Sequence, residues 1–150
     1  EGFRLPTLRT LRLFLGHELN REFFYARKGV AMLFDILRAH TSDAAMVAGV
    51  AYAVAAAATR HEGNKAAAML EVENGAPLVS SIEEHGHSRG AVQGVCEILE
   101  ALTTGDDPRE MASGAFRNAQ TLAKFGAATS LLKVLETISG VGTDESATRL

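Results

Sequence analysis

The stretch Asn64–Gly105, NKAAAMLEVENGAPLVSSIEEHGHSRGAVQGVCEILEALTTG, has the pattern of one complete unit of three helices. A short helix capped by Asn64 is expected to end at Gly75, because glycine readily adopts the left-handed turn that closes a helix. Apolar residues at spacings of three and four predict a second helix over Ala76–Glu84. Ser88 is expected to cap a third helix. The apolar stripe of that third helix consists of Val92, Val95, Cys96, Leu99 and Leu102.

Partial copies of this unit lie on both sides of it. Gly29, Gly75 and Gly126 each precede an amphipathic helix, and they are 46 (75 − 29) and 51 (126 − 75) residues apart. Long third helices are predicted over Asp43–Thr59 and Ser88–Thr103. A short helix led by an asparagine precedes each glycine, at Asn20, Asn64 and Asn118. Three helices per unit and a period of about 40 to 47 residues are typical of armadillo and HEAT repeats.

At these residues the chain resembles the armadillo superfamily, whose repeat has a short helix, a glycine, a second helix and a long third helix. Four strings, Thr59–Lys65, Glu84–Ser88, Asp106–Arg109 and Gly114–Ala119, are similar to the family of armadillo repeat-containing protein six. The resemblance covers about Gly29–Glu136. It implies an all-α fold, an armadillo-type α-solenoid in which three-helix repeats form a right-handed superhelix. It also implies that the third helices line a concave groove where partners dock.

The repeat units divide the single domain predicted over 1–150 into four parts. Residues 1–19 are expected to end one repeat, and 20–63 and 64–105 to form complete repeats. Residues 106–150 are expected to form a lengthened, incomplete repeat. The whole segment therefore corresponds to a run of repeats with an unfinished unit at each end.

The unfinished units have their own predicted helices. Pro6–Leu19 is predicted as a third helix, and Arg109–Lys124 as an unusually long first helix that follows the break at Pro108. The apolar stripe of the first of these consists of Leu8, Leu11, Phe14 and Leu15. Neither end has the polar outer face of a terminal repeat, so we expect an interior segment of a longer protein.

The composition suits one domain with a continuous core, since 47% of the 150 residues are hydrophobic. A net charge of −3 gives no general electrostatic case for nucleic acid or an anionic membrane as a partner. No apolar run reaches the roughly 18 residues that indicate a membrane span. The single cysteine, Cys96, lies on an apolar stripe, which indicates a buried thiol and a reducing compartment. We therefore expect a cytoplasmic protein, with the nucleus or the cytoskeleton as alternatives.

Catalytic, cofactor and metal sites are not predicted. His85 and His87 flank a glycine in a predicted loop, and with Cys96 inside a helix they do not supply the rigid set of ligands that zinc requires. Glu83 and Glu84 are neighbours in the chain, whereas the two groups of an acid–base pair face each other across a cleft. The prediction is a protein that is not an enzyme.

Third-helix residues outside the apolar stripe define the predicted groove. A shift of 45 residues relates Glu97 to Tyr52, and it places Ala56 and Ala101 where importin-type armadillo proteins carry asparagine. Since the chain also has no tryptophan, a nuclear-signal peptide is not the expected ligand, and a helix or hydrophobic segment fits better. The residues predicted to bind a partner are Arg9 and Arg12 at one end, Tyr52 in the middle, and Gln93, Glu97 and Glu100 at the other. The alternative is that they form only a solvated face.

The predicted function is a non-catalytic scaffold or adaptor that holds a protein partner, as a helix or an extended peptide, along the concave face. The alternative is a structural subunit of a large assembly, for example a cytoskeletal or ciliary one. Phe23, Phe24 and Tyr25 favour the alternative, because one helix cannot bury three consecutive aromatic side chains. Basic residues near the N-terminus define a strip for an acidic protein surface: Arg4, Arg9, Arg12, Arg21, Arg27 and Lys28.

Overall fold

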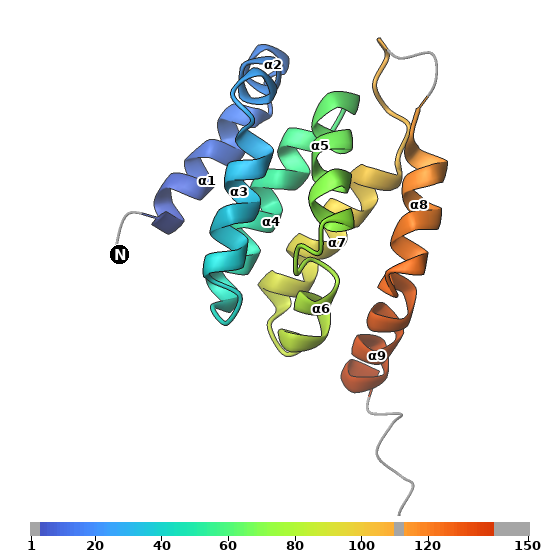
Figure 1. Cartoon of the computed structure of the whole chain (residues 1–150). Helices are drawn as coiled ribbons and strands as arrows, with labels where there is room; N and C mark the ends of the chain where they lie inside the picture. The colour runs from blue at the N-terminus through green and yellow to red at the C-terminus, as the bar shows by residue number, and fades with distance from the viewer. Residues whose placement is uncertain (1–3, 110–112, 140–150) are drawn as a thin grey trace, which may run out of the picture.

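The computed structural model describes residues 4–109 and 113–139, which contain nine helices and no strand. Figure 1 shows their arrangement, and the prediction of an all-α chain is confirmed for this part of the sequence. In chain order the helices are α1 (Arg4–Leu15), α2 (Glu18–Ala26), α3 (Gly29–Ala39), α4 (Ala44–Ala58), α5 (Glu62–Glu73), α6 (Ser80–Glu84), α7 (Arg89–Thr103), α8 (Ala115–Lys124) and α9 (Ala127–Ser139).

Helices α1, α4 and α7 form a row in which α4 packs against both neighbours, and these two contacts are the most extensive between helices. The remaining helices form the pairs α2–α3, α5–α6 and α8–α9. In Figure 1 the first two pairs lie in front of the row, and α8–α9 lies at the right-hand side. We call α2–α4 the first layer, α5–α7 the second and α8–α9 the third. Helix α3 contacts α5, and α6 contacts α9, so each layer packs on the next.

Two glycines let the row pack closely. A Cβ atom at Gly49 would lie 3.1 Å from Leu8 Cδ1, and one at Gly94 would lie 3.0 Å from Ala51 Cβ. The two positions are 45 residues apart (94 − 49), and each faces the preceding helix of the row. The Ala-rich helix α4 is buried between its neighbours. Within the described residues, no helix combines the length and apolar character needed to cross a membrane.

The turn before α6 differs from the prediction. Gly75 has a φ of 83°, as expected for the left-handed turn, and Ser88 Oγ accepts the backbone N–H of Ala91 as the N-cap of α7. The second helix, however, covers only Ser80–Glu84 rather than Ala76–Glu84. The reason is that the backbone N–H of Ala76 still closes α5 by donating to Glu71 O, so the chain needs a further turn before it becomes helical.

The expected N-cap of α5 is wrong. His61 is the N-cap, and its Nδ1 accepts the backbone N–H of Asn64 at 3.1 Å. Asn64 is fully buried inside the helix, where its Nδ2 donates to Ala57 O at 2.9 Å and to Arg21 O at 3.3 Å. The asparagine therefore links α5 to the C-terminal end of α4 rather than starting a helix.

The same link recurs at the end of each helix in the row. Asn118 Nδ2 donates to Leu102 O in the last turn of α7 at 2.9 Å. Arg21 Nη1 donates to Leu15 O at the end of α1, also at 2.9 Å. In each case a side chain from the following short helix donates to a carbonyl in the last turn of a long helix, where the long helix itself offers no partner. In the first layer, Arg21 has this role. Asn20, predicted to lead the short helix, lies inside α2 and also donates to the end of α1, from its Nδ2 to Phe14 O at 2.7 Å.

Two predicted helices have different limits. Helix α8 begins at Ala115, so the long first helix predicted over Arg109–Lys124 is wrong, and Arg109, Ser113 and Gly114 are not helical. Asp107 Oδ1 accepts the backbone N–H of Arg109 two residues later, which turns the link locally. Helix α1 ends at Leu15 rather than Leu19, and Phe14, predicted to be buried, is 61% exposed. The predicted features beyond Ser139 lie outside the described residues.

Candidate functional site

The side of the row that faces away from the other helices carries two adjoining cavities. The first has a volume of about 620 Å³, and its apolar wall consists of Leu5, Leu8, Ala44, Ala45, Ala48 and Gly49. The second has a volume of about 420 Å³ and is lined by Ala55, Ala56, Thr59, Glu97, Glu100, Ala101, Thr104 and Asp106. Arg12 and Tyr52 line both cavities. We therefore treat the two as one surface and call it the row groove.

Arg12 crosses the middle of the row groove. Its guanidinium carbon lies 4.3 Å from the centroid of the Tyr52 ring, a distance at which a cation is attracted to the face of an aromatic ring. Its Nη2 donates to Glu97 Oε2 at 3.2 Å. Gln93 Nε2 donates to the other oxygen, Glu97 Oε1, at 3.4 Å. One contact thus joins α1, α4 and α7.

The predicted site residues are only partly brought together. Arg12 contacts both Tyr52 and Glu97. Arg9 lines only the first cavity, and Glu100 lines only the second. Gln93 contacts Glu97 but lines a different cavity, beside the loop before α7. The 45-residue shift located the α4 and α7 members because these helices are parallel and in register.

Asp106 closes one end of the second cavity, and sequence reasoning missed it. The residue lies in the link after α7 and accepts hydrogen bonds from Lys65 Nζ and from the backbone N–H of Arg60. Lys65 is completely buried and also donates to Glu62 Oε1 at 3.2 Å, so its charge is paired. Helical spacing gives no signal for Asp106, because an irregular link brings it back to the groove.

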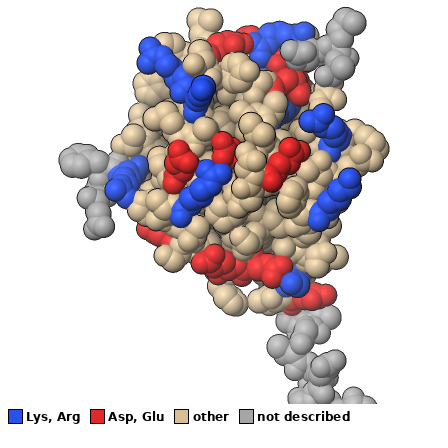
Figure 2. All heavy atoms as spheres, viewed as in Figure 1, with Lys and Arg blue, Asp and Glu red and all other residues tan. Residues whose placement is uncertain are grey.

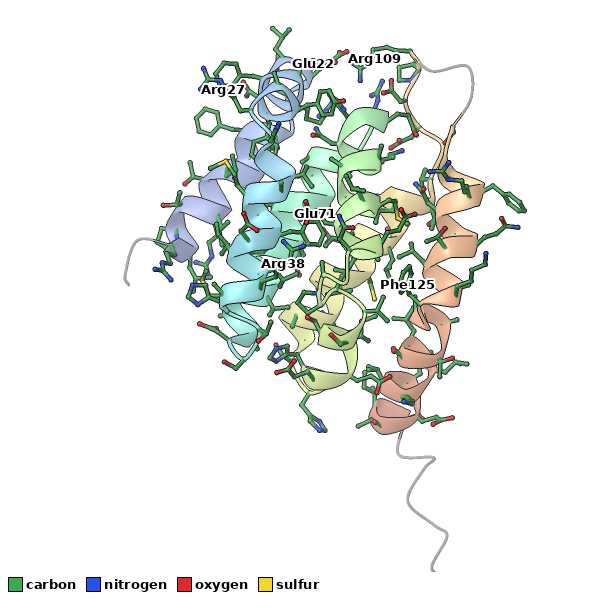
Figure 3. The ribbon with its side chains drawn as sticks, in the orientation of Figure 1. Glu22, Arg27, Arg38, Glu71, Arg109 and Phe125 are labelled. Carbon is green, nitrogen blue, oxygen red and sulfur yellow. The ribbon has the colours of Figure 1, made fainter. Side chains whose placement is uncertain are left out.

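A second group of charges lies away from the row groove, where α2, the start of α5 and the link meet (Figure 3). Arg109 donates to both oxygens of Asp107, at 2.9 and 2.8 Å, and to Glu22. These hydrogen bonds hold the pKa of Asp107 well below its usual range and raise the pKa of Arg109. Arg109 also lowers the pKa of Glu22, whose Oε2 lies 3.4 Å from His61 Nε2. Glu22 of α2, by accepting from Arg109, holds the link on α2, and Asp107 fixes the position of the Arg109 guanidinium within the link.

No group of three or more His, Cys, Asp and Glu residues in 4–109 and 113–139 is placed to hold a metal ion. His85 lies in the loop as predicted, and its Nε2 is 2.6 Å from Thr41 O. Cys96, predicted to be buried, is half-buried, and this burial raises the pKa of its thiol.

The predicted basic strip does not form as described. Arg21 is only 7% exposed, because its guanidinium is used to hold the end of α1. On the face shown in Figure 2, acidic and basic side chains are interspersed over the front helices. Arg38, for example, pairs with both Asp35 and Glu71 across α3 and α5 (Figure 3). Acidic side chains gather along the lower edge of that face (Figure 2), and over the rest of it the two signs are mixed.

The three consecutive aromatic residues of α2 behave as expected. Phe23 and Tyr25 are 62% and 48% exposed, and only Phe24 packs against the core. Tyr25 also lies against His61, with 5.4 Å between the ring centroids.

The comparisons with known proteins return no relative. No protein-family model matches the chain, and neither the curated proteins nor the solved structures searched contain a match. What the fold defines is the class, an all-α protein over its described residues. The row groove and the exposed faces of the helices therefore carry the functional argument.

Proposed function

We propose that this chain is a non-catalytic protein-interaction module that holds a segment of a protein partner in the row groove. The observation that carries the proposal is the meeting of Arg12, Tyr52 and Glu97, from three helices, between two cavities on one face. Aromatic and arginine side chains contribute strongly to binding energy at protein interfaces. No cofactor has a role in this function, and the cytoplasm is the proposed location, with the nucleus or cytoskeleton as alternatives.

An armadillo-type solenoid is the architecture that we propose for the stack. Two observations support it. The order of a short, a second and a long helix recurs in the first and second layers. The links from Arg21, Asn64 and Asn118 also recur at the ends of α1, α4 and α7. In such a stack the row of long helices is the surface that extended partners follow.

The two cavities suit different parts of a partner. The first is walled mainly by aliphatic side chains, so an apolar side chain gains from burial there. The second contains the hydroxyls of Thr59 and Thr104 and the carboxylate of Glu100, so it suits polar or cationic groups. An amphipathic helix or an extended peptide can present both.

Site-specific photo-crosslinking tests this function. A benzoylphenylalanine in place of Thr59, an exposed residue of the second cavity, is compared with one in place of Gln120, an exposed residue of α8. We expect a discrete protein to crosslink from position 59 and not from position 120. The affinity of the protein identified is then measured for Tyr52→Ala and Glu97→Lys, and each is expected to fall about 5- to 30-fold. Unchanged affinity of both variants would exclude the row groove as the site.

A structural subunit of a larger assembly is the second candidate. It is favoured by apolar side chains exposed at both ends of the stack, because permanent interfaces between subunits are richer in apolar residues than transient ones. At the α1 end these are Leu13, Phe14, Leu19 and Phe23, and at the α9 end Leu132, Leu135 and Ile138. Partners of such a subunit would stay bound when Tyr52 and Glu97 are changed.

A further inference from the structure

The two cavities of the row groove each contain one unpaired charge, and the two charges have opposite signs. Arg9 lines the first cavity and Glu100 the second. Within residues 4–109 and 113–139, neither the Arg9 guanidinium nor the Glu100 carboxylate has a hydrogen bond or an ion pair. Both residues are exposed, so both charges are available to a partner.

The remaining charges of the row groove are already paired. Arg12 donates to Glu97, and Asp106 accepts from the buried Lys65. These pairs stabilise the groove itself. An unpaired charge, by contrast, can pair with an opposite charge across an interface and so select the partner.

The helix dipoles have the same polarity as the unpaired charges. The first cavity lies at the N-terminal ends of α4 and α7, where it is lined by Ala44 and Ser88. The second lies at their C-terminal ends, where Thr59 and Thr104 line it. The N-terminal end of a helix carries a partial positive charge and the C-terminal end a partial negative one. The first cavity therefore favours an anionic group, and the second a cationic group.

Between the two charges the surface of the row groove is mainly apolar. Helix α4 presents Ala48 to the first cavity and Ala55 to the second, and Tyr52 stands between them. Leu5 and Leu8 of α1 complete the apolar wall of the first cavity. An apolar side chain of a partner can therefore pack beside Tyr52 while a charged side chain reaches each end.

We propose that the partner segment in the row groove carries an acidic side chain that pairs with Arg9, a basic side chain that pairs with Glu100, and an apolar side chain between them. This inference rests on the proposed function, because it names the chemistry of the segment that the groove holds. It also fixes the orientation of that segment along α4 and α7, since the reversed segment would bring like charges together.

Selection from a library of random twelve-residue peptides displayed on phage tests the proposal. A segment of that length covers about 18 Å as a helix and about 40 Å when extended, so it can reach both cavities in either form. The selected peptides are then titrated in fluorescence anisotropy, where we expect them to bind the wild-type chain and to lose affinity with Tyr52→Ala. They are expected to share an acidic and a basic residue at a constant spacing, with an apolar residue between.

Charge reversals assign each charge of the peptide to its own residue of the groove. Arg9→Glu and Glu100→Lys are each expected to lower the affinity of a selected peptide by about 3- to 10-fold. A peptide in which lysine replaces the acidic residue is expected to regain affinity for Arg9→Glu and not for Glu100→Lys. A peptide in which glutamate replaces the basic residue is expected to show the converse. Rescue of each variant by the other peptide would overturn the proposal.

The matched controls are Arg117→Glu on α8 and Glu73→Lys on α5. Both reverse an exposed charge that lines neither cavity of the row groove. They are expected to bind the selected peptides like the wild type, and circular dichroism checks that all four reversals keep the fold. Equal losses in the controls would contradict the proposal, because the effect would then come from net charge alone.

The outcomes separate this inference from the proposed function. Peptides that need Tyr52 but share no charge pattern would overturn the inference and leave the row groove as the binding surface. Peptides that bind Tyr52→Ala as tightly as the wild type, or a library without any binder, would overturn both.

Discussion

Helices α3 and α9 are built on the same register, in which equivalent positions are 98 residues apart (132 − 34), but only α3 is part of a finished core. In α3 the register places Phe34 and Leu37 under α4, and in α9 it leaves Leu132 and Leu135 exposed. An apolar stripe thus marks the face that a helix can bury, whereas its actual burial depends on which segment packs against it.

The largest expected difference is between truncations at equivalent positions. Phe34→Ala removes a completely buried ring and is expected to lower the free energy of unfolding by about 3 to 5 kcal/mol. Leu132→Ala removes an exposed side chain and is expected to change it by less than about 0.5 kcal/mol. Urea unfolding at low protein concentration measures both. Equal losses would mean that α9 is covered in solution even in the monomer.

The links between layers should differ in the same sense. Asn64 is fully buried and pairs with two carbonyls, so Asn64→Ala is expected to cost about 2 to 3 kcal/mol. Asn118 lies in the third layer and pairs with only one, so Asn118→Ala is expected to cost about 1 kcal/mol. The same urea titrations give both values. A larger loss at Asn118 would reverse the order of stability between the second and third layers.

The turns before α3 and α9 permit a reciprocal exchange. Lys28 has a left-handed φ of 54°, a conformation that costs a residue with a Cβ about 1 kcal/mol. Lys28→Gly is therefore expected to raise the free energy of unfolding by up to about 1 kcal/mol. Gly126→Ala is expected to lower it by a similar amount, although no atom lies within 4 Å of the added Cβ. Thermal unfolding that shifts both variants in one direction would refute the equivalence of the two turns.

The smallest effect concerns the attachment of α9 to α6. Ser130 and then Lys133 donate to Glu83 and lower its pKa from the ordinary 4.5. A lowered pKa in the folded state stabilises the fold above pH 4.5, and this contribution is lost as the pH falls through the folded-state value. Glu83→Gln is thus expected to lower the thermal midpoint slightly at pH 7, with a difference that fades in acid. A difference independent of pH would rule out this cause.

Local signals predicted much of the fold. The left-handed turn at Gly75, the cap at Ser88 and the three-helix order depend on residues close in the chain. The groove members Tyr52 and Glu97 were also found, because α4 and α7 each have 15 residues and a constant shift relates them. Their role in binding a partner stays a prediction.

Contacts between distant segments were the ones that sequence reasoning missed. Asparagine is a residue type favoured at N-caps, but the side chain of Asn64 donates to carbonyls of α2 and α4. No local pattern in the sequence reveals these partners. The break at Pro108 was predicted, but the helix was expected to restart at Arg109, whereas α8 begins at Ala115. Asp106 and Asp107 accept hydrogen bonds from the backbone N–H groups of Arg60 and Glu62, more than 40 residues earlier, and so hold the start of the link on α5. The exposure of Phe14 was missed for the same reason, since an apolar period carries no information on which distant segment packs against it.

Arg109 gives the molecule a mechanical asymmetry. It belongs to the link that leads into the third layer, yet it pairs with Glu22 and Glu18 in the first, over the start of α5. A stack in which each layer contacts only the adjacent layers can bend equally toward either of its two sides. The ion pairs of Arg109 connect the link before the third layer with the first layer, along one side of the stack. Bending that separates the layers on that side must stretch these ion pairs. Bending toward that side leaves them intact. Salt weakens exposed ion pairs. When the folded chain is stretched in an optical trap, its stiffness is therefore expected to fall as the ionic strength rises. Arg109→Gln is expected to lower the stiffness and to remove this dependence on salt.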